Sequence, residues 1–184
     1  MALCLEGPRI LLREITQDDA AALARYWTDN AEHLRPWQPA FGAEYRTETF
    51  WRSRIEAGSG AGKTTLRMGI HARAAPGKLA GLFTLQDIVL SPLWSAMLGY
   101  SVDKMHEGQG LIGEAVRLGV GHAFGALGLH RIYASYMVGN DRSARVLERA
   151  GFEREGVLRR LLRVEGVWQD HVQMSLIYDG WTDT

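Results

Sequence analysis

The chain contains 184 residues, the length of one ordinary domain, and its 46% apolar and 23% charged residues match a globular protein. Its 21 basic and 21 acidic side chains cancel, so no overall charge attracts a nucleic acid or an anionic membrane. A single cysteine excludes internal disulfides and four-cysteine zinc sites. The apolar stretch at the start is short and soon broken by charges. We therefore expect one soluble, cytoplasmic domain over residues 1–184, with no signal peptide, no membrane span and no direct binding of nucleic acid.

The first part of the chain is predicted to hold one strand and two helices. Alternating residues at 9–15 indicate a strand, and the apolar face of 20–27 indicates a helix. Two prolines within 33–39 favour a loop, and the pattern at 44–57 is helical again. The three glycines within 58–62 then predict a flexible turn.

From residue 64 onward the hydrophobic pattern has mainly a period of two, interrupted by two helices. The most regular helix, 111–127, ends at Gly128, and a shorter one covers 141–150 before Gly151. The expected strands cover 64–72, 79–89, 94–102, 131–138, 157–164 and 167–178. Strands and helices mixed in this order predict an α+β fold with helices on the faces of one sheet.

A glycine-rich loop lies between the strand at 94–102 and the helix at 111–127. Gly108, Gly110 and Gly113 let the backbone approach a ligand closely, and the start of the helix adds free N–H groups and the positive end of its dipole. Such a loop suits a pyrophosphate and needs no lysine to bind it. A glycine-rich turn that merely joins a strand to a helix is the alternative.

Sequence motifs around and after this loop make a functional interpretation of the loop more specific. Gly-Gln-Gly at 108–110 and Glu-Ala at 114–115 are followed by Asn-Asp-Arg-Ser-Ala-Arg-Val-Leu-Glu-Arg-Ala-Gly-Phe at 140–152. Three further segments are Leu-Arg-Pro-Trp at 34–37, Leu-Gly-Tyr at 98–100 and Gly-Val-Trp-Gln-Asp at 166–170. At these positions the chain resembles the GNAT superfamily of acyl-CoA-dependent N-acyltransferases. Within it, the chain is most similar to the branch of ribosomal-protein N-terminal alanine and serine acetyltransferases (RimJ/RimL-like), over about residues 9–178.

The resemblance implies a GNAT fold, with a central mixed, mostly antiparallel sheet of about seven strands flanked by helices. It also implies acetyl-CoA as the acyl donor, with its pantetheine at the backbone of 101–103 and its pyrophosphate in the loop 108–113. Asn140 would bind the cofactor near its acyl end, and Ser143 would lie near the thiol sulfur. The cofactor-binding residues implied in this way are Ser101, Val102, Asp103, Gly108, Gln109, Gly110, Leu111, Ile112, Gly113, Asn140 and Ser143.

Two residues of the loop depart from the family pattern. Glu107 stands where Gln or Arg is common, and Ile112 stands where Gly or Ala is common. A carboxylate beside a pyrophosphate is repulsive, so we expect Glu107 to point to solvent. Glu114, in the first turn of the helix, suits the helix dipole and is open to a purely structural role.

Amide formation from a thioester needs a polarised carbonyl and a proton for the leaving thiolate. Backbone N–H groups of the strand at 94–102 can polarise the carbonyl. By resemblance, Asn140 and Ser143 are catalytic candidates, with Ser143 relaying a proton to the thiolate or hydrogen-bonding it. Tyr133 and Tyr136 are alternative donors. Asn140 and Ser143 can also be plain caps of the helix that follows.

The general base is less clearly marked. Some relatives carry a glutamate at the position of Leu162. Asp170 and His171 are the candidates here, although Asp170 can equally hold a strand by accepting backbone N–H groups. A weak base suffices for an α-amine, since a pKa near ~8 leaves roughly a tenth of it neutral at pH 7, whereas lysine near ~10.4 is almost never neutral. The expected acceptor is therefore a protein N-terminus or a small-molecule amine.

The remaining candidates concern the acceptor and the cofactor's ribose phosphate. The resemblance places Arg35 and Trp37 beside the acceptor as substrate-binding residues, although Trp37 can also be plain packing. Arg142 and Arg145 suit the ribose 3′-phosphate of coenzyme A, with a solvated helix face as the simpler alternative. The six histidines show no spacing typical of metal ligands, so no metal is expected. Relatives often pair, which makes a homodimer an open alternative.

Two other functions are alternatives to an N-acetyltransferase. A non-catalytic acyl-CoA-binding module of the same fold is favoured by Leu162 and Glu107. A P-loop nucleotide hydrolase would use Ala57–Thr64, whose glycines precede Lys63 and Thr64. A P-loop needs a strand before it and a helix after it, whereas this segment has a helical pattern before it and a strand pattern after it.

Overall fold

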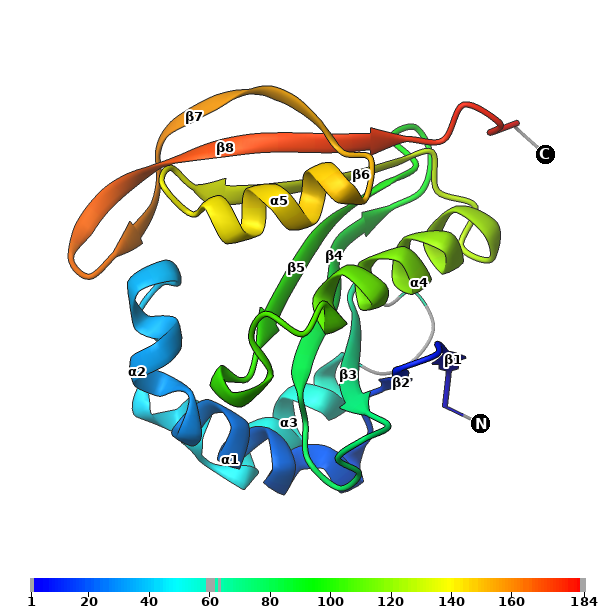
Figure 1. The fold of residues 1–184 in the computed structure, drawn as a ribbon. Helices are drawn as coiled ribbons and strands as arrows, with labels where there is room; N and C mark the ends of the chain where they lie inside the picture. The colour runs from blue at the N-terminus through cyan, green and yellow to red at the C-terminus, as the bar shows by residue number, and fades with distance from the viewer. Residues whose placement is uncertain (1, 59–61, 63, 183–184) are drawn as a thin grey trace.

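The computed structural model describes residues 2–58, 62 and 64–182, which form one eight-stranded sheet with helices on it (Figure 1). The strands, in the sheet order β1-β2-β3-β4-β5-β6-β8-β7, are β1 (Cys4–Glu6), β2 (Ile10–Glu14), β3 (Leu66–Ala72), β4 (Gly81–Val89), β5 (Ser95–Val102), β6 (Arg131–Met137), β8 (Val167–Ile177) and β7 (Glu153–Val164). Only β5 and β6 are parallel; the other neighbours are antiparallel. The predicted α+β fold is confirmed, and β1, with only three residues, is the strand that the sequence pattern missed.

Two hydrophobic cores lie on opposite faces of this sheet. The α-helices of the described residues are α1 (Ala20–Asp29), α2 (Ala31–Leu34), α3 (Glu48–Ala57), α4 (Leu111–Gly125) and α5 (Asp141–Arg149). The core under α4 and α5 contains Phe83, and the smaller core contains α1, α3 and Leu79. Gly119 brings α4 close to the sheet, because a Cβ there would lie 2.2 Å from the ring of Phe83. Helices α4 and α5 thus cover one face of the sheet, and α1 and α3 cover the other.

The central strands β5 and β6 separate part of the way along their length (Figure 1). They pair only over Ser95–Met97 and Arg131–Tyr133. Beyond this point β5 stays paired with β4 as far as Val102, and β6 stays paired with β8 as far as Met137. A wedge therefore opens between the two strands at the end from which the glycine loop and α5 begin.

Several boundaries differ from the sequence-based prediction. The segment 33–39, expected as a loop, is mostly helical: α2 covers its start, and a 3-10 turn follows at Arg35–Trp37. Pro36 fits there because the first turn of a helix needs no N–H from it. The predicted helix 44–57 is divided at Thr47, whose hydroxyl accepts a hydrogen bond from the N–H of Phe50 and caps α3.

The alternative P-loop has the wrong neighbours. α3 ends at Ala57, and the next regular element is the strand β3, so the order of strand and helix is the reverse of what a P-loop needs. Residues 59–61 and 63 of the segment Ala57–Thr64 lie outside the described part of the chain. None of the helices described here is both long and apolar enough to cross a membrane.

Candidate active site

The glycine loop starts α4 in a conformation that requires glycine. Gly108 and Gly110 have φ angles of 71° and 73°, in the left-handed region where a side chain is strained. Gly110 is the N-cap of α4, so the free N–H groups of the first turn face outward from this point. A Cβ on Gly108 would meet nothing within 4 Å, which leaves room for a ligand against the backbone.

Arg9 holds this loop from a distant part of the sequence. Its Nη1 donates to the carbonyl oxygen of Gln109 at 2.8 Å, and its Nη2 donates to that of Gly110 at 3.2 Å. Its Nε donates to Glu114 Oε2 at 2.9 Å. No local sequence pattern marks Arg9 as a functional residue, and only the packing of β2 beside α4 brings it to the loop.

Glu114 is a structural anchor. Its Oε1 accepts from the backbone N–H groups of Arg9 at 2.9 Å and Ile10 at 3.2 Å, and its side chain is only 5% exposed. Burial raises the pKa of the Glu114 carboxyl, but the hydrogen bonds from Arg9 and Ile10 outweigh this, and the pKa lies below its ordinary value. The carboxylate therefore fastens α4 to β2 and is not free to act on a ligand.

The loop borders a cavity of about 670 Å³ that carries a strong positive charge. Its described lining includes one acidic residue, Glu107, and five arginines: Arg9, Arg117, Arg142, Arg145 and Arg149. Gly108, Gly110, Leu111, Ile112 and Gly113 of the predicted pyrophosphate loop line it too, as does Val102. Backbone N–H groups, a helix N-terminus and arginines together are the donors that phosphate groups need, so the cavity fits the phosphates of acetyl-CoA.

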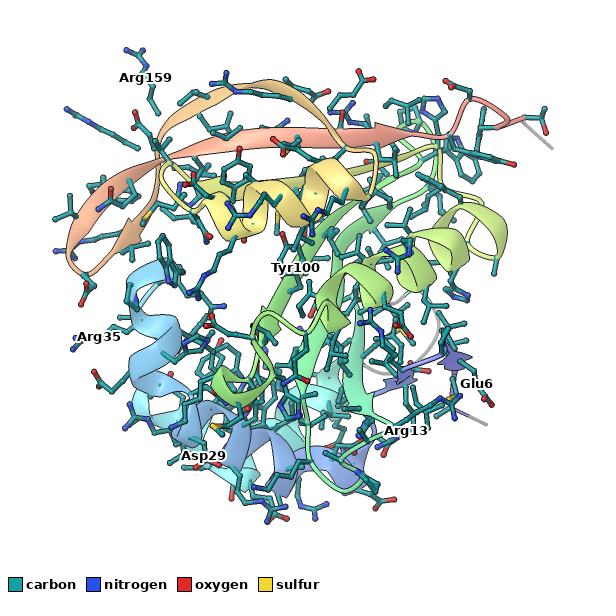
Figure 2. The ribbon with its side chains drawn as sticks, viewed as in Figure 1. Glu6, Arg13, Asp29, Arg35, Tyr100 and Arg159 are labelled. Atoms are coloured by element: carbon teal, nitrogen blue, oxygen red, sulfur yellow. The ribbon has the colours of Figure 1, made fainter. Side chains whose placement is uncertain are left out.

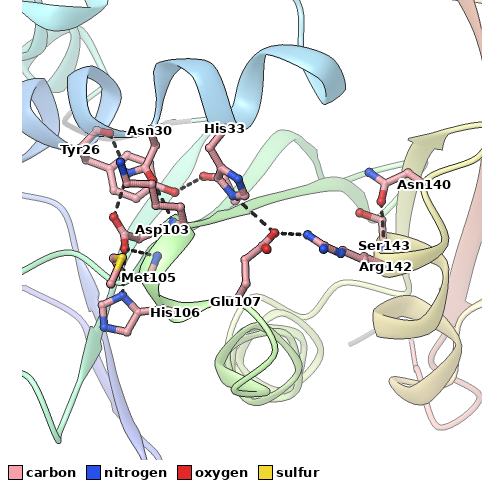
Figure 3. Close-up of polar contacts among 12 residues, drawn as sticks. Tyr26, Asn30, His33, Asp103, Met105, His106, Glu107, Asn140, Arg142 and Ser143 are labelled. Atoms are coloured by element: carbon pink, nitrogen blue, oxygen red, sulfur yellow. Dashed lines mark hydrogen bonds and ion pairs between the residues drawn. The ribbon is translucent and has the colours of Figure 1, made fainter.

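Glu107 does not point to solvent, so that prediction was wrong. Its carboxylate pairs with Arg142 at the start of α5, and His33 Nε2 of α2 lies 3.5 Å from Oε1 (Figure 3). The Glu107 side chain is 30% exposed. The guanidinium of Arg142 offsets the repulsion that a carboxylate would otherwise bring to an anion site. Arg142, proposed as part of a solvated face, is exposed but ion-paired.

A second cavity of about 350 Å³ lies between the C-terminal half of β5, β6 and the helices α1 and α3. We call it the aromatic cavity because its lining includes Trp27, Trp37, Phe41, Tyr45, Trp51, Tyr100 and Tyr136. Ser101, Asn140 and Ser143 of the predicted cofactor site also line it. The two cavities share β5 and α5 as walls, since Ser101 and Ser143 line one while Val102 and Arg142 line the other. The wedge therefore joins an anion site to an apolar chamber.

Asn140, Ser143 and Tyr100 are connected at this junction. Asn140 Oδ1 accepts from the backbone N–H of Ser143 at 3.2 Å and so caps α5 (Figure 3). The Tyr100 hydroxyl donates to the carbonyl oxygen of Ser143 at 3.3 Å. Burial raises the pKa of Tyr100 to about 12, so the hydroxyl keeps its proton at neutral pH. Tyr100 is a donor that the sequence analysis did not single out, and it lies near the middle of the view in Figure 2.

The two tyrosines named as alternative donors are placed differently. Tyr136 lines the aromatic cavity. Tyr133 pairs with Met97 on β5, where the strands are still joined, and so lies at the closed end of the wedge. Tyr136 is therefore the better placed of the two.

Ser101 and Asp103 have their side chains occupied. The hydroxyls of Ser101 and Tyr26 are 2.8 Å apart. Asp103 accepts from Asn30 Nδ2 at 3.0 Å and from the N–H of Met105 at 2.9 Å (Figure 3). Burial acts to raise the pKa of Asp103, but these hydrogen bonds keep it below its ordinary value. Both residues fix the strand end and the turn before the glycine loop, and the backbone N–H of Asp103 donates to the carbonyl oxygen of Ala80 at 2.9 Å.

His171 is placed better than Asp170 for a general base. His171 is only 3% exposed, lines the aromatic cavity, and has Nδ1 3.0 Å from the carbonyl oxygen of Gln169. Because a carbonyl only accepts, Nδ1 carries a proton, and the Nε2 of a neutral ring keeps its lone pair. Asp170 is exposed and accepts from the backbone N–H of Arg160 at 2.8 Å, at an irregular turn of β7. This matches the strand-holding alternative.

The two residues expected to bind the acceptor, Arg35 and Trp37, lie in different surroundings. Trp37 lines the aromatic cavity, as does Leu162. Arg35 lies in the 3-10 turn after α2, where it pairs with Glu32 at 3.5 Å and Glu165 at 3.2 Å (Figure 2). Arg35 therefore ties α2 to the β7–β8 hairpin, and Trp37 is the member of the pair that meets the chamber. No group of three or more potential metal-binding side chains occurs in the part of the chain that the structure describes.

Comparison with known proteins agrees with this geometry. The family described as "Acetyltransferase (GNAT) domain" matches residues 9–153. The probable N-acetyltransferase YjcK of Bacillus subtilis is 35% identical over 175 residues, covering 94% of this chain and 96% of that protein. The crystal structure of ribosomal-protein-S5-alanine acetyltransferase from Vibrio fischeri has a TM-score of 0.93 at 30% identity, covering 98% and 100% of the two chains. Mycobacterium smegmatis RimJ in complex with CoA-disulfide has a TM-score of 0.87 at 30% identity, covering 100% and 90%.

Proposed function

The chain belongs to the GNAT family of N-acetyltransferases, which use acetyl-CoA as acyl donor, and we propose that it acetylates the α-amine at a protein N-terminus. The observation that carries this proposal is the wedge between β5 and β6. An arginine-lined cavity suited to the cofactor's phosphates opens beside it, and an aromatic chamber suited to an acceptor opens on its other side. A small-molecule amine is the alternative acceptor.

The chain's own residues divide into those that hold the cofactor and those that act on the acceptor. The amides of the glycine loop and the cavity arginines, including Arg142 and Arg145, would hold the phosphates. The backbone of 101–103 would hold the pantetheine. Acetyl-CoA supplies a thioester whose acetyl group moves to the amine nitrogen while the thiol leaves.

Proton transfer is assigned to groups at the junction of the two cavities. His171 Nε2, in a ring held by Gln169, takes a proton from the acceptor's ammonium before attack or from the amine nitrogen as its bond to the carbonyl carbon forms. The hydroxyl of Ser143 hydrogen-bonds the departing sulfur, or that of Tyr100 does so after leaving the carbonyl oxygen of Ser143, and Asn140 keeps the start of α5 in position for this. The N–H groups of β5 beyond Met97 that are not bonded to β4 face the wedge after β6 has separated, and they polarise the carbonyl.

A protein N-terminus is favoured over a lysine side chain for a chemical reason. An α-amine has a pKa near ~8, so a useful fraction is neutral without a strong base, and Leu162 supplies no carboxylate. The names of two relatives specify an alanine acetyltransferase of a ribosomal protein and RimJ. A ribosomal-protein acceptor would place the reaction in the cytoplasm. Pairing of the chain as a homodimer stays a prediction.

Thermal unfolding with acetyl-CoA and, separately, with magnesium-ATP tests the cofactor first. A ligand at ~100 times its dissociation constant stabilises the fold by ~2.7 kcal/mol, several degrees for a domain of this size. We expect acetyl-CoA alone to raise Tm, followed by thiol release with peptides that have a free α-amine. A shift without thiol release from any peptide or small amine would favour a non-catalytic acyl-CoA-binding module. Release with small amines alone would exclude the N-terminal acceptor.

A further inference from the structure

One wall of the aromatic cavity carries positive charge that nothing in the described residues neutralises. Arg67 on β3 and Arg54 in the last turn of α3 both line the cavity. None of the described lining residues is an aspartate or a glutamate. Arg54 is exposed, whereas Arg67 is half-buried, and a cation partly removed from water needs an anion or several hydrogen bonds.

The two guanidinium groups lie on neighbouring elements. Arg67 Nη1 lies 3.2 Å from the position that a Cβ on Gly58 would take, at the end of α3. Arg54, one turn earlier, places its guanidinium 5.8 Å from the centre of the Phe50 ring. Across β3 and β4, Arg67 is paired with Thr84, which also lines the cavity. Arg67 therefore lies on the sheet side of the chamber, and Arg54 lies on the side formed by α3.

Neither side chain has an acceptor for its guanidinium N–H groups among the residues that the structure describes. Arg67 is half-buried. Burial and the neighbouring charge of Arg54 both lower its pKa, which stays far above neutrality for an arginine. Both groups are thus charged donors, and each makes the other's position less favourable.

A third donor lies in the same chamber. Trp27 lines the cavity, and its buried Nε1–H has no acceptor within the described structure. A buried polar group without a partner costs about 1–3 kcal/mol, so such groups in a cavity commonly receive a partner from a ligand. The same lining holds one buried acceptor without a partner in the described structure, Gln38 Oε1. Two guanidinium groups, the Trp27 N–H and no carboxylate nevertheless match a ligand that brings a negatively charged oxygen.

We propose that Arg54 and Arg67 bind an anionic group, a carboxylate or a phosphate, carried by the amine acceptor. This inference rests on the proposed function and names its substrate class: N-terminal peptides with an acidic side chain within their first few residues. The alternative is that Arg67 only balances the C-terminal end of the α3 dipole. That alternative predicts an effect of Arg67 on stability and none on the choice of acceptor.

Matched peptides separate these two roles. We would measure kcat/KM for peptides of equal length that begin with alanine and carry glutamate, glutamine or phosphoserine at position two, three or four. We expect glutamate at one position to exceed glutamine by about tenfold or more, since a charge-assisted pair commonly has that effect. The phosphoserine peptide shows whether phosphate serves as well as carboxylate. Equal kcat/KM for glutamate and glutamine at every position would overturn the proposal.

Variants assign the preference to the two arginines. Arg67→Met and Arg54→Met should each lower kcat/KM for the glutamate peptide by about tenfold and leave the glutamine peptide within about twofold. Arg52→Met is the matched control, because Arg52 lies on α3 but pairs with Glu48 at 2.7 Å outside the chamber. Equal losses on both peptides would assign Arg67 to stability and reject the anion site. The exposed Arg54 keeps the test valid if Arg67→Met does not fold.

Failure of the proposed function has a different signature. If no peptide is acetylated while small amines are, the N-terminal acceptor is wrong. The same comparison is then made with 4-aminobutanoate and 4-aminobutanamide, which differ in one carboxylate. A preference for the carboxylate that Arg67→Met removes would support the anion site, and equal rates would reject it.

Discussion

Arg9 and Glu114, 105 residues apart in the sequence, are joined by a bond of 2.9 Å between Nε and Oε2. The same guanidinium donates to the carbonyl oxygens of Gln109 and Gly110, so one side chain links β2, the glycine loop and the first turn of α4. The loop conformation that suits a pyrophosphate therefore depends on a contact with Arg9, near the N-terminus of the chain. This relationship makes Arg9 a positioning residue for the cofactor site.

Replacing Arg9 by methionine should weaken acetyl-CoA binding. The variant leaves the loop carbonyls without donors and removes one positive charge from the cavity, so we expect Kd to rise about tenfold. Titration calorimetry with coenzyme A measures this. Arg73→Met is the control, because Arg73 bonds Glu6 and the carbonyl of Gly7 near the same strands without touching the loop. Equal affinities of both variants would show that the loop keeps its shape without Arg9.

The unfolding free energy at acid pH should show the contribution of the Glu114 carboxylate to stability. The pKa of Glu114 lies below its ordinary value of 4.5 in the folded chain, so the unfolded state binds the proton more readily. Its contribution is complete above pH 4.5 and is lost as the pH falls from there through the lowered pKa. Glu114→Gln should reduce the unfolding free energy at pH 7 by about 1–3 kcal/mol.

Urea unfolding from pH 7 to pH 3 checks the sign. The difference between wild type and Glu114→Gln should be largest at neutral pH and shrink toward acid, because only the wild-type group takes up a proton there. A difference that stays constant over this range would mean that the lost hydrogen-bond geometry, and not the charge, accounts for the effect.

Gly110→Val should block the cofactor. Valine strains a backbone with φ of 73°, and its Cβ would lie 3.2 Å from Arg9 Nη2, so the loop must move. We expect acetyl-CoA affinity to fall by about a hundredfold. Gly128→Val is a matched control, since Gly128 has φ of 65° at the other end of α4 and its Cβ would meet nothing within 4 Å. Unchanged affinity in a folded Gly110→Val variant would reject this loop as the pyrophosphate site.

The local motifs of this site could be predicted from sequence, and the long-range contacts could not. The glycine loop and the start of α5 are short segments whose residue types reveal strand, turn and helix start, and the structure confirms them as such. Arg9 and Glu107 acquire their partners only when distant segments pack together. The expectation for Glu107 failed because it considered a single charge beside a pyrophosphate, without Arg142 and His33.

The same limit applies to the chamber. Arg54 and Arg67 lie on a helix and a strand where isolated arginines usually point to solvent, so the sequence gives no signal that they share a cavity. Asp170 and His171 are adjacent residues, yet strand alternation sends one outward and the other inward. That alternation was readable in the sequence, but the buried face of the last strand depends on its register with β6 and β7.

Variants of Ser143 and Tyr100 distinguish which hydroxyl hydrogen-bonds the leaving thiolate. Ser143→Ala should lower kcat by about tenfold or more with little change in acetyl-CoA affinity if its hydroxyl hydrogen-bonds the sulfur. Tyr100→Phe removes the hydroxyl that lies 3.3 Å from the Ser143 carbonyl oxygen. Single-turnover thiol release separates chemistry from binding in both variants. An unaffected rate in Ser143→Ala would leave Ser143 as part of the helix start and transfer the role to Tyr100.

His171 should be essential to turnover, and Asp170 should not. His171→Gln removes the buried Nε2 from the chamber, and loss of a general base commonly lowers kcat by ~10²–10⁴-fold. Asp170→Asn keeps an oxygen for the N–H of Arg160 and should leave kcat within about twofold. The measurement is kcat with saturating acetyl-CoA and peptide, beside the acetyl-CoA Kd, which we expect both variants to keep. A large loss in Asp170→Asn with normal turnover in His171→Gln would reverse the assignment, because geometry at the β7 turn would then be less important than the Asp170 charge.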